Sequence, residues 1–180
     1  MATDSFGTDG TPPPGWTADA TISDPIAATS GHVAGTNFGT PGLIYLPGSS
    51  QASSEFLYSG GFFPNDSGPA LRYGDGNCYY LAGAANLVRK DSGSAALIQT
   101  GGPGQANGDT LKITREGNDI VGYLNGAEIL RATDTTYTGS CNPALHMIGP
   151  FAEYDDFDDG AGGGGGGGKP WIHYQRQMAA

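Results

Sequence analysis

Residues 109–134 read DTLKITREGNDIVGYLNGAEILRATD, a pattern typical of three antiparallel strands. Leu111 and Ile113 alternate with polar neighbours, and because side chains alternate across a strand, both are expected on the buried face. Residues 116–119 predict the first turn. Asn125-Gly126 predicts the second, because both residues tolerate the positive φ angles that a two-residue hairpin requires. The stretch therefore predicts a three-stranded meander.

Short apolar runs separated by turn residues continue on both sides of this meander. No window keeps apolar residues at helical spacing without an interrupting Gly or Pro. Short strands at such spacing are typical of a sandwich or a barrel. The strand segments expected outside the meander are 42–46, 55–58, 78–81, 86–89, 141–148 and 151–157. We predict an all-β, antiparallel β-sandwich with these side chains buried: Leu111, Ile113, Leu124, Ile148 and Phe157.

The composition changes near residue 160, which divides the chain into three parts. Residues 1–159 are the predicted sandwich, residues 160–168 are a Gly-rich linker, and residues 169–180 are a short aromatic and basic peptide. This peptide is too short to bury its apolar side chains against itself, and exposed aromatic residues are enriched at interfaces. We therefore expect it to dock on another protein chain through these residues: Trp171, Ile172, Tyr174 and Arg176.

The charge balance is acidic, with 8 Lys and Arg against 18 Asp and Glu and a net charge of −10. This balance argues against nucleic-acid binding, which needs clustered basic residues, and against docking on anionic membranes. No segment approaches the roughly 18 apolar residues of a membrane span. The first residues also lack the basic and apolar stretches of a secretory signal. We therefore expect the protein in the cytosol, or carried out of the cell within a larger particle.

Cys78 and Cys141 are too few for a disulfide framework in a chain of 180 residues. Both lie in predicted strand segments, so a single disulfide between them remains open. Neither has a second ligand at metal spacing, which argues against a metal site. His146 lies in an apolar segment and is expected in the core rather than in a catalytic role.

Several short motifs occur in the order found in one known family. The motifs are Asp4-Ser5-Phe6, an Asp-Gly turn, Gly15-Trp16, GDTL at 108–111, YLNG at 123–126, the loop 133–139, and DDF at 155–157. In this order they resemble the concanavalin A-like (laminin-G-like) domains common in bacteriophage virion proteins, and the resemblance covers roughly residues 4–159. A Gly-rich tract ending in an aromatic peptide is similar to what phage minor tail proteins carry. Residues 17–39 depart from the family, because a Pro-, Ser- and Thr-rich stretch replaces a regular strand.

The resemblance implies a jelly-roll sandwich with a binding or structural role more often than a catalytic one. The function expected first is a non-enzymatic structural protein of a bacteriophage virion, a minor tail or decoration protein anchored by its C-terminal peptide. Such a protein is assembled in the host cytoplasm, and its expected partners are other virion proteins, copies of itself and a glycan of the host surface. The alternative is a free-standing carbohydrate-binding module or a remnant of a glycoside hydrolase.

The acidic residues near the end of the predicted sandwich are candidates for two roles, glycoside hydrolysis and Ca²⁺ binding. Glu153, Asp155 and Asp158 approach the Glu-x-Asp-x-x-Glu signature of concanavalin A-like glycosidases, but the third side chain is one methylene shorter. We therefore predict no catalytic residues and no enzyme activity. Asp155, Asp156 and Asp158 are also candidate ligands for Ca²⁺, which laminin-G-like folds often bind at a sandwich edge. The alternative is an acidic strand that protects a sheet edge, and no other cofactor is expected.

Sugar binding needs exposed aromatic rings to stack on, and amides or acids to bond to hydroxyl groups. The candidate glycan-binding residues are Trp16, Tyr73, Tyr79 and Tyr137. Most aromatic side chains of a sandwich pack in its core, so the sequence leaves open which of these rings face solvent.

Overall fold

The computed structural model describes residues 3–4, 10–23, 25–29, 32–35, 41–61, 66–148 and 152–159. In chain order the strands are β1 (Thr3–Asp4), β2 (Thr17–Ser23), β3 (Ile26–Thr29), β4 (His32–Gly35), β5 (Pro41–Tyr45), β6 (Ser53–Gly61), β7 (Gly68–Gly74), β8 (Asn77–Ala82), β9 (Asn86–Asp91), β10 (Ser94–Thr100), β11 (Thr110–Glu116), β12 (Asp119–Leu124), β13 (Ala127–Thr133), β14 (Asn142–Ile148) and β15 (Ala152–Asp158). These described residues form no α-helix, which confirms the all-β prediction. Nor do they contain a helix of the length and hydropathy needed to cross a membrane.

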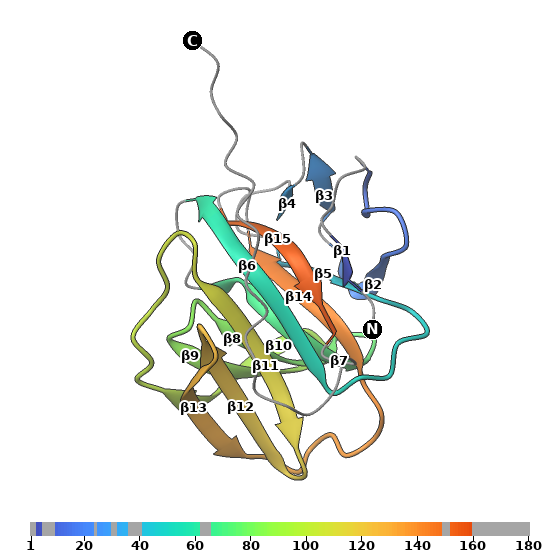
Figure 1. Ribbon diagram of the computed structural model, residues 1–180. Coiled ribbons are helices and arrows are strands. Elements are labelled where there is room, and N and C mark those ends of the chain that lie inside the picture. Colours follow the sequence, from blue (N-terminus) through green and yellow to red (C-terminus); the bar gives the residue numbers. More distant parts are fainter. Residues whose placement is uncertain are drawn as a thin grey trace.

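Two antiparallel sheets face each other as the layers of a sandwich (Figure 1). Sheet A has eight strands, seven of them in the order β13-β12-β11-β6-β15-β4-β3, with β1 paired to β15 beside this path. Sheet B has seven strands in the order β10-β9-β8-β7-β14-β5-β2. In both sheets a strand from late in the chain lies between early ones, because β15 separates β6 from β4 and β14 separates β7 from β5. This arrangement is the predicted jelly-roll sandwich.

The predicted meander forms β11, β12 and β13. Leu111 pairs with Leu124 and Ile113 with Gly122, so the side chains expected inside share one face of sheet A. The φ angles are 51° at Asn125 and 79° at Gly126, as the two-residue turn requires. The first turn is shorter than predicted, because β11 continues through Glu116 and β12 begins at Asp119.

Aromatic rings fill much of the space between the two sheets. The ring of Trp16 meets Phe157 edge-on at a centroid distance of 4.8 Å, and Phe157 lies 5.0 Å from Phe56. Phe56 in turn lies 6.2 Å from Tyr154. Because these residues come from β6, β15 and the segment before β2, the cluster ties the chain's early, middle and late parts together.

The burial predictions hold for three residues and fail for two. Leu111 and Ile113 are 0% exposed and Phe157 is 2% exposed. Leu124 and Ile148 are only half-buried, because each is the last residue of its strand, where the covering layer ends.

Sheet B is buried on both of its faces near its centre. Leu43 and Ile44 are both at most 1% exposed, although successive side chains of a strand point to opposite faces. Leu43 belongs with Cys78 to an apolar cluster on the outer face of the sheet, whereas Ile44 belongs with Cys141 to the core between the sheets. The two cysteines thus lie on opposite faces of sheet B, and both are free thiols.

The stretch 17–39, which departs from the family pattern, is not devoid of strands. It contains β2 at the end of sheet B, and β4 and β3 at the end of sheet A. The pairing of β2 with β5 is interrupted between Ala18 and Ser23.

Candidate functional site

Three of the four aromatic candidates meet between the sheets, although they are far apart in the sequence. Tyr73 comes from β7, Tyr79 from β8 and Tyr137 from the segment that follows β13. The ring centroids of Tyr73 and Tyr137 stack at 5.3 Å, and Tyr79 lies 5.6 Å from Tyr73 and 5.4 Å from Tyr137. We call these three residues the tyrosine cluster. Trp16, the fourth candidate, is 5% exposed in the core and presents no open ring face.

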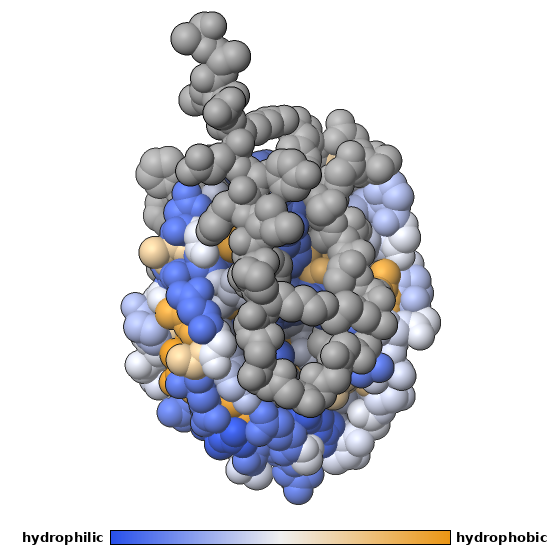
Figure 2. Space-filling view, viewed as in Figure 1, coloured by the Kyte–Doolittle hydropathy of each residue, from blue (hydrophilic) through white to orange (hydrophobic). Residues whose placement is uncertain are grey.

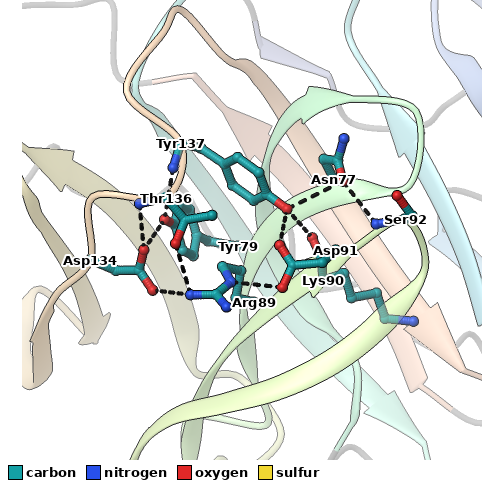
Figure 3. A network of polar contacts seen from close by, with 9 residues as sticks. All are labelled: Asn77, Tyr79, Arg89, Lys90, Asp91, Ser92, Asp134, Thr136 and Tyr137. Carbon is teal, nitrogen blue, oxygen red and sulfur yellow. Dashed lines mark hydrogen bonds and ion pairs between the residues drawn. The ribbon is translucent and has the colours of Figure 1, made fainter.

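An ionic network adjoins the tyrosine cluster, as Figure 3 shows. Arg89 of β9 lies between two carboxylates: its Nε is 2.9 Å from Oδ2 of Asp91, and its Nη1 is 2.6 Å from Oδ2 of Asp134. Asp134 also accepts hydrogen bonds from the Tyr79 hydroxyl at 2.7 Å and from the Thr136 backbone N–H at 2.8 Å. This network holds the segment after β13, which leaves sheet A, against β8 and β9 of sheet B.

The hydroxyl group of Tyr137 has three acceptors within reach. They are the Asp91 carboxylate, the Lys90 carbonyl oxygen at 2.8 Å and Oδ1 of Asn77 at 3.2 Å (Figure 3). A phenol carries one proton, so it donates fully to only one of them. Asn77 is itself fixed, because its Oδ1 accepts the Ser92 N–H at 2.8 Å. The Tyr137 hydroxyl therefore has more hydrogen-bond acceptors around it than it has protons to donate.

Arg115 of β11 supports the cluster from the side of sheet A. Its guanidinium carbon lies 5.8 Å from the centroid of the Tyr73 ring. One guanidinium nitrogen donates to the Tyr73 hydroxyl at 3.4 Å and to the Tyr137 carbonyl oxygen. The ring stack is thus held by a cation on one side and by carboxylates on the other.

The surroundings raise the pKa of the Tyr79 phenol and lower the pKa values of the Asp91 and Asp134 carboxyl groups. Burial, and then the hydrogen bond to Asp134, raises the pKa of Tyr79 to about 12. Burial opposes ionisation of Asp134, but hydrogen bonds from Thr136, Tyr79 and Arg89 outweigh it and lower the pKa to about 2. The hydrogen bond from Tyr137 also lowers the pKa of Asp91. At neutral pH the site therefore presents ionised carboxylates beside neutral phenols.

Access to the site differs among its polar groups. The side chain of Asp91 is 42% exposed and that of Arg89 is 24% exposed, whereas Asp134 is 9% exposed. Tyr73 and Tyr137 are half-buried, and Tyr79 is fully buried. A ligand would therefore meet Asp91, Arg89 and the exposed parts of Tyr73 and Tyr137, while Tyr79 and Asp134 support these residues from behind.

The acids near the end of the sandwich lie elsewhere. Ala152, Tyr154 and Phe157 of β15 point into the core, so Glu153 and Asp155 share the outer face of sheet A. The shared face agrees with the alternation of the sequence. Oδ2 of Asp155 is 3.9 Å from Nδ1 of His32.

A bulge interrupts β15 at the three aspartates considered for Ca²⁺, Asp155, Asp156 and Asp158. Asp156 has a φ angle of 47°, and the pairing with β6 shifts between Asp155 and Asp158. In the part of the chain that the structure describes, no three His, Cys, Asp or Glu side chains are grouped to hold a metal ion, and this set is no exception.

His146 is a core residue, as predicted. It is 0% exposed, its Nδ1 is 3.0 Å from the Asp66 carbonyl oxygen, and its ring stacks on Tyr80 at 4.0 Å. Burial, and then the nearby charge of Lys90, lowers its pKa to about 3. The docking residues Trp171, Ile172, Tyr174 and Arg176 lie outside the described residues, as do the linker and the rest of the C-terminal peptide.

Sequence reasoning missed the charged residues of the site. Arg89 and Asp91 lie two residues apart in β9, but turns and whole strands separate them from Asp134, and no local motif links the three. One weak signal exists in the sequence: Asp134 lies in the loop 133–139, which resembles a family motif.

Solved structures with the same architecture include sugar-binding and sugar-cleaving proteins. A carbohydrate-binding module (CBM66) from Bacillus subtilis is 18% identical, with a TM-score of 0.60 over 79% of this chain and 91% of that chain. A protein of unknown function with a galectin-like fold, also from Bacillus subtilis, is 14% identical, with a TM-score of 0.51 over 87% of this chain and 93% of that chain. A xylan β-1,4-xylosidase from Bacillus halodurans is 13% identical, with a TM-score of 0.56 over 87% of this chain but 38% of that chain.

These likenesses show the fold alone, an antiparallel β-sandwich that this chain shares with a carbohydrate-binding module and with a protein of galectin-like fold. No known family model matches the sequence, and no curated protein matches it in sequence.

Proposed function

We propose that this chain is a non-catalytic sandwich that binds a glycan at the tyrosine cluster. The observation that carries the proposal is the meeting of Tyr73 and Tyr137 with Arg89 and Asp91 at one partly exposed place. Sugars present both apolar C–H faces and hydroxyl groups, so they bind where exposed aromatic surface lies beside paired donors and acceptors. The carbohydrate-binding module of the same fold supports the class of ligand but not the position of the site.

Binding to a glycan array, followed by calorimetry on the best ligand, tests this proposal. Tyr137→Ala removes both the ring and the hydroxyl, and we expect it to weaken binding at least about tenfold, equivalent to about 1.4 kcal/mol. Tyr137→Phe keeps the ring and loses the hydroxyl, so we expect an intermediate loss. Tyr123→Ala is the matched control, because Tyr123 is a partly exposed tyrosine of β12 that bonds to Glu116 at 2.5 Å, outside the cluster.

The melting temperature of each variant separates lost binding from lost folding. Loss of binding in Tyr137→Ala at an unchanged melting temperature supports the site. The absence of any glycan ligand, or equal binding by Tyr137→Ala and the wild type, contradicts it.

We also propose that the sandwich is a structural component of a bacteriophage virion, anchored by residues 169–180. The support comes from the order of the sequence motifs and from the aromatic and basic peptide after the glycine run. The anchor's partner is another virion protein or a neighbouring copy, whose acidic surface would attract Lys169 and Arg176. Glycan binding and virion assembly are compatible, since a particle protein that binds a host glycan performs both.

Mass spectrometry of purified particles tests the virion role. We expect the full chain in the particle, and we expect a chain truncated after Gly160 to fold but to be absent from it. Trp171→Ala should reproduce most of that loss, because aromatic anchors dominate interface energy. Normal incorporation of the truncated chain would contradict the anchor.

A further inference from the structure

The strand β10 ends sheet B, and its outer edge has no hydrogen-bonding partner among the described residues. β10 pairs only with β9, and the pair Asp91 and Ser94 closes a two-residue turn. Ser92 and Gly93 in this turn have φ angles of 49° and 86°. The closing pair of such a hairpin exchanges both hydrogen bonds, and the pattern then alternates along the ladder. The backbone N–H and C=O groups of Ala95 and Leu97 therefore point away from β9.

The other described sheet ends are protected, and β10 is not. The outer edge of β3 bonds to Gly10, through N–H···O contacts of 3.2 and 2.9 Å between Gly10 and Ala28. β13 carries Glu128 and Arg131, and its side of the molecule is largely hydrophilic (Figure 2). β2 carries Asp19 and pairs irregularly with β5. By contrast, β10 reads SAALIQT, with neither a charge nor a proline, the usual devices against edge-to-edge pairing.

An exposed apolar side chain marks the same strand. Leu97 is 61% exposed, and within the described ranges no other large hydrophobic residue is exposed. It pairs with Val88 and so extends the apolar cluster on the outer face of sheet B to the edge of the sheet. Open backbone groups and exposed apolar surface thus coincide at β10.

The charge distribution identifies a second copy of this chain as the partner. Two chains of net charge −10 repel each other over most of their surface. β10 itself is uncharged, so no like charges on the strand oppose each other when two copies approach edge to edge. A strand that pairs antiparallel with its own copy across a two-fold axis also matches donors to acceptors without any further sequence requirement. Pairing of two β10 strands therefore brings no like charges of these strands together, and it gives hydrogen-bond partners to the open backbone groups of both copies.

We infer that two copies of this protein associate by antiparallel pairing of β10 with β10, so that sheet B continues across the dimer. The bulge between Leu97 and Gln99 limits the pairing to the first half of the strand. The contact brings the two Leu97 side chains onto one face of the joined sheet. This dimer does not depend on the glycan site proposed above.

Sedimentation velocity of the full chain, from about 1 to 100 µM, tests the dimer by mass action. Ala95→Pro removes an N–H that points away from β9, so it should leave the sandwich folded and make the protein monomeric. Leu97→Lys places a charge on the edge and should do the same. The matched control is Glu128→Pro on β13, because Glu128 follows the closing pair of its hairpin as Ala95 follows Ser94. This control should remain dimeric.

Amide hydrogen exchange gives a second readout on the wild type. We expect the amides of Ala95 and Leu97 to be protected at high protein concentration and to exchange rapidly at low concentration. A monomeric wild type over the whole range would overturn the inference. So would a dimer that persists in Leu97→Lys, a surface change that keeps the fold even if Ala95→Pro does not.

Discussion

The hydroxyl of Tyr79 lies 2.7 Å from Asp134, although the ring of Tyr79 has no exposed surface. Tyr79 was selected from the sequence as a ring that a sugar could stack on, and the structure gives it a supporting position instead. Its proton helps to keep Asp134 ionised, and Asp134 in turn orients Arg89 at 2.6 Å. At the scale of single residues, the site therefore depends on a buried carboxylate behind the exposed groups.

Asp134→Asn should reveal this carboxylate through the pH dependence of stability. The pKa of Asp134 is lowered in the folded state to about 2 from an ordinary value of 3.8. Ionised Asp134 therefore stabilises the fold above about pH 4, and this stabilisation is lost as the pH falls toward 2. We expect the variant to melt below the wild type at neutral pH, and the gap to narrow between pH 4 and pH 2 in thermal unfolding. A gap that stays constant with pH would contradict the assignment.

At the scale of the elements, the turn between β12 and β13 is hydrogen-bonded to the start of β11 through the side chain of Asn125. Oδ1 of Asn125 accepts the Thr110 N–H at 2.9 Å, and its Nδ2 donates to Oδ1 of Asp109 at 2.7 Å. The turn at one end of β12 is thereby tied to the start of β11. The sequence predicts the turn from Asn125-Gly126, but the tie follows only from the pairing of the strands.

Asn125→Ala should destabilise the sandwich by about 1–2 kcal/mol in urea unfolding, because alanine disfavours a positive φ angle and loses both side-chain hydrogen bonds. Glycine adopts a positive φ angle without cost but also lacks the two side-chain hydrogen bonds. Asn125→Gly should therefore be more stable than Asn125→Ala and less stable than the wild type. Equal stability of the alanine and glycine variants would show that the φ angle of 51° contributes little.

Considered as a whole molecule, the sandwich separates the acidic residues of β15 from its aromatic site. Glu153 and Asp155 lie on the outer face of sheet A, in β15, whereas the tyrosine cluster lies between the sheets beside β8 and β9. Sheet B continues past the cluster to the open edge at β10. The proposed glycan site, the acidic residues of β15 and the proposed associating edge therefore lie in three different parts of one fold.

Glu153→Gln should therefore leave glycan binding unchanged in calorimetry, since the side chain lies in another part of the sandwich. We expect no release of reducing sugars by either the wild type or the variant, because the proposed function is binding. Turnover of a polysaccharide that disappears in Glu153→Gln would show instead that the acids of β15 are catalytic.

Prediction from the sequence succeeds where neighbours along the chain suffice. Leu111 and Ile113 are buried because period-two alternation places them on one strand face, and this needs no knowledge of the partner sheet. The burial prediction for Leu124 is wrong, because the residues next to it in the sequence do not show where the opposite sheet stops covering β12. The edge strand β10 carries no polar alternation or proline to mark it, so neither its existence nor its open edge was anticipated.

The meander of β11, β12 and β13, its Asn125-Gly126 turn and the sandwich class follow from the sequence alone, because alternation and positive φ angles are properties of adjacent residues. The site does not follow from it. Tyr79 and Asp134 are 55 residues apart, and Tyr137 and Asn77 are 60 apart. Contacts over such separations exist only once two sheets have stacked and the chain has crossed between them. Hydrophobic burial drives that step, and it depends on the whole core rather than on any one motif.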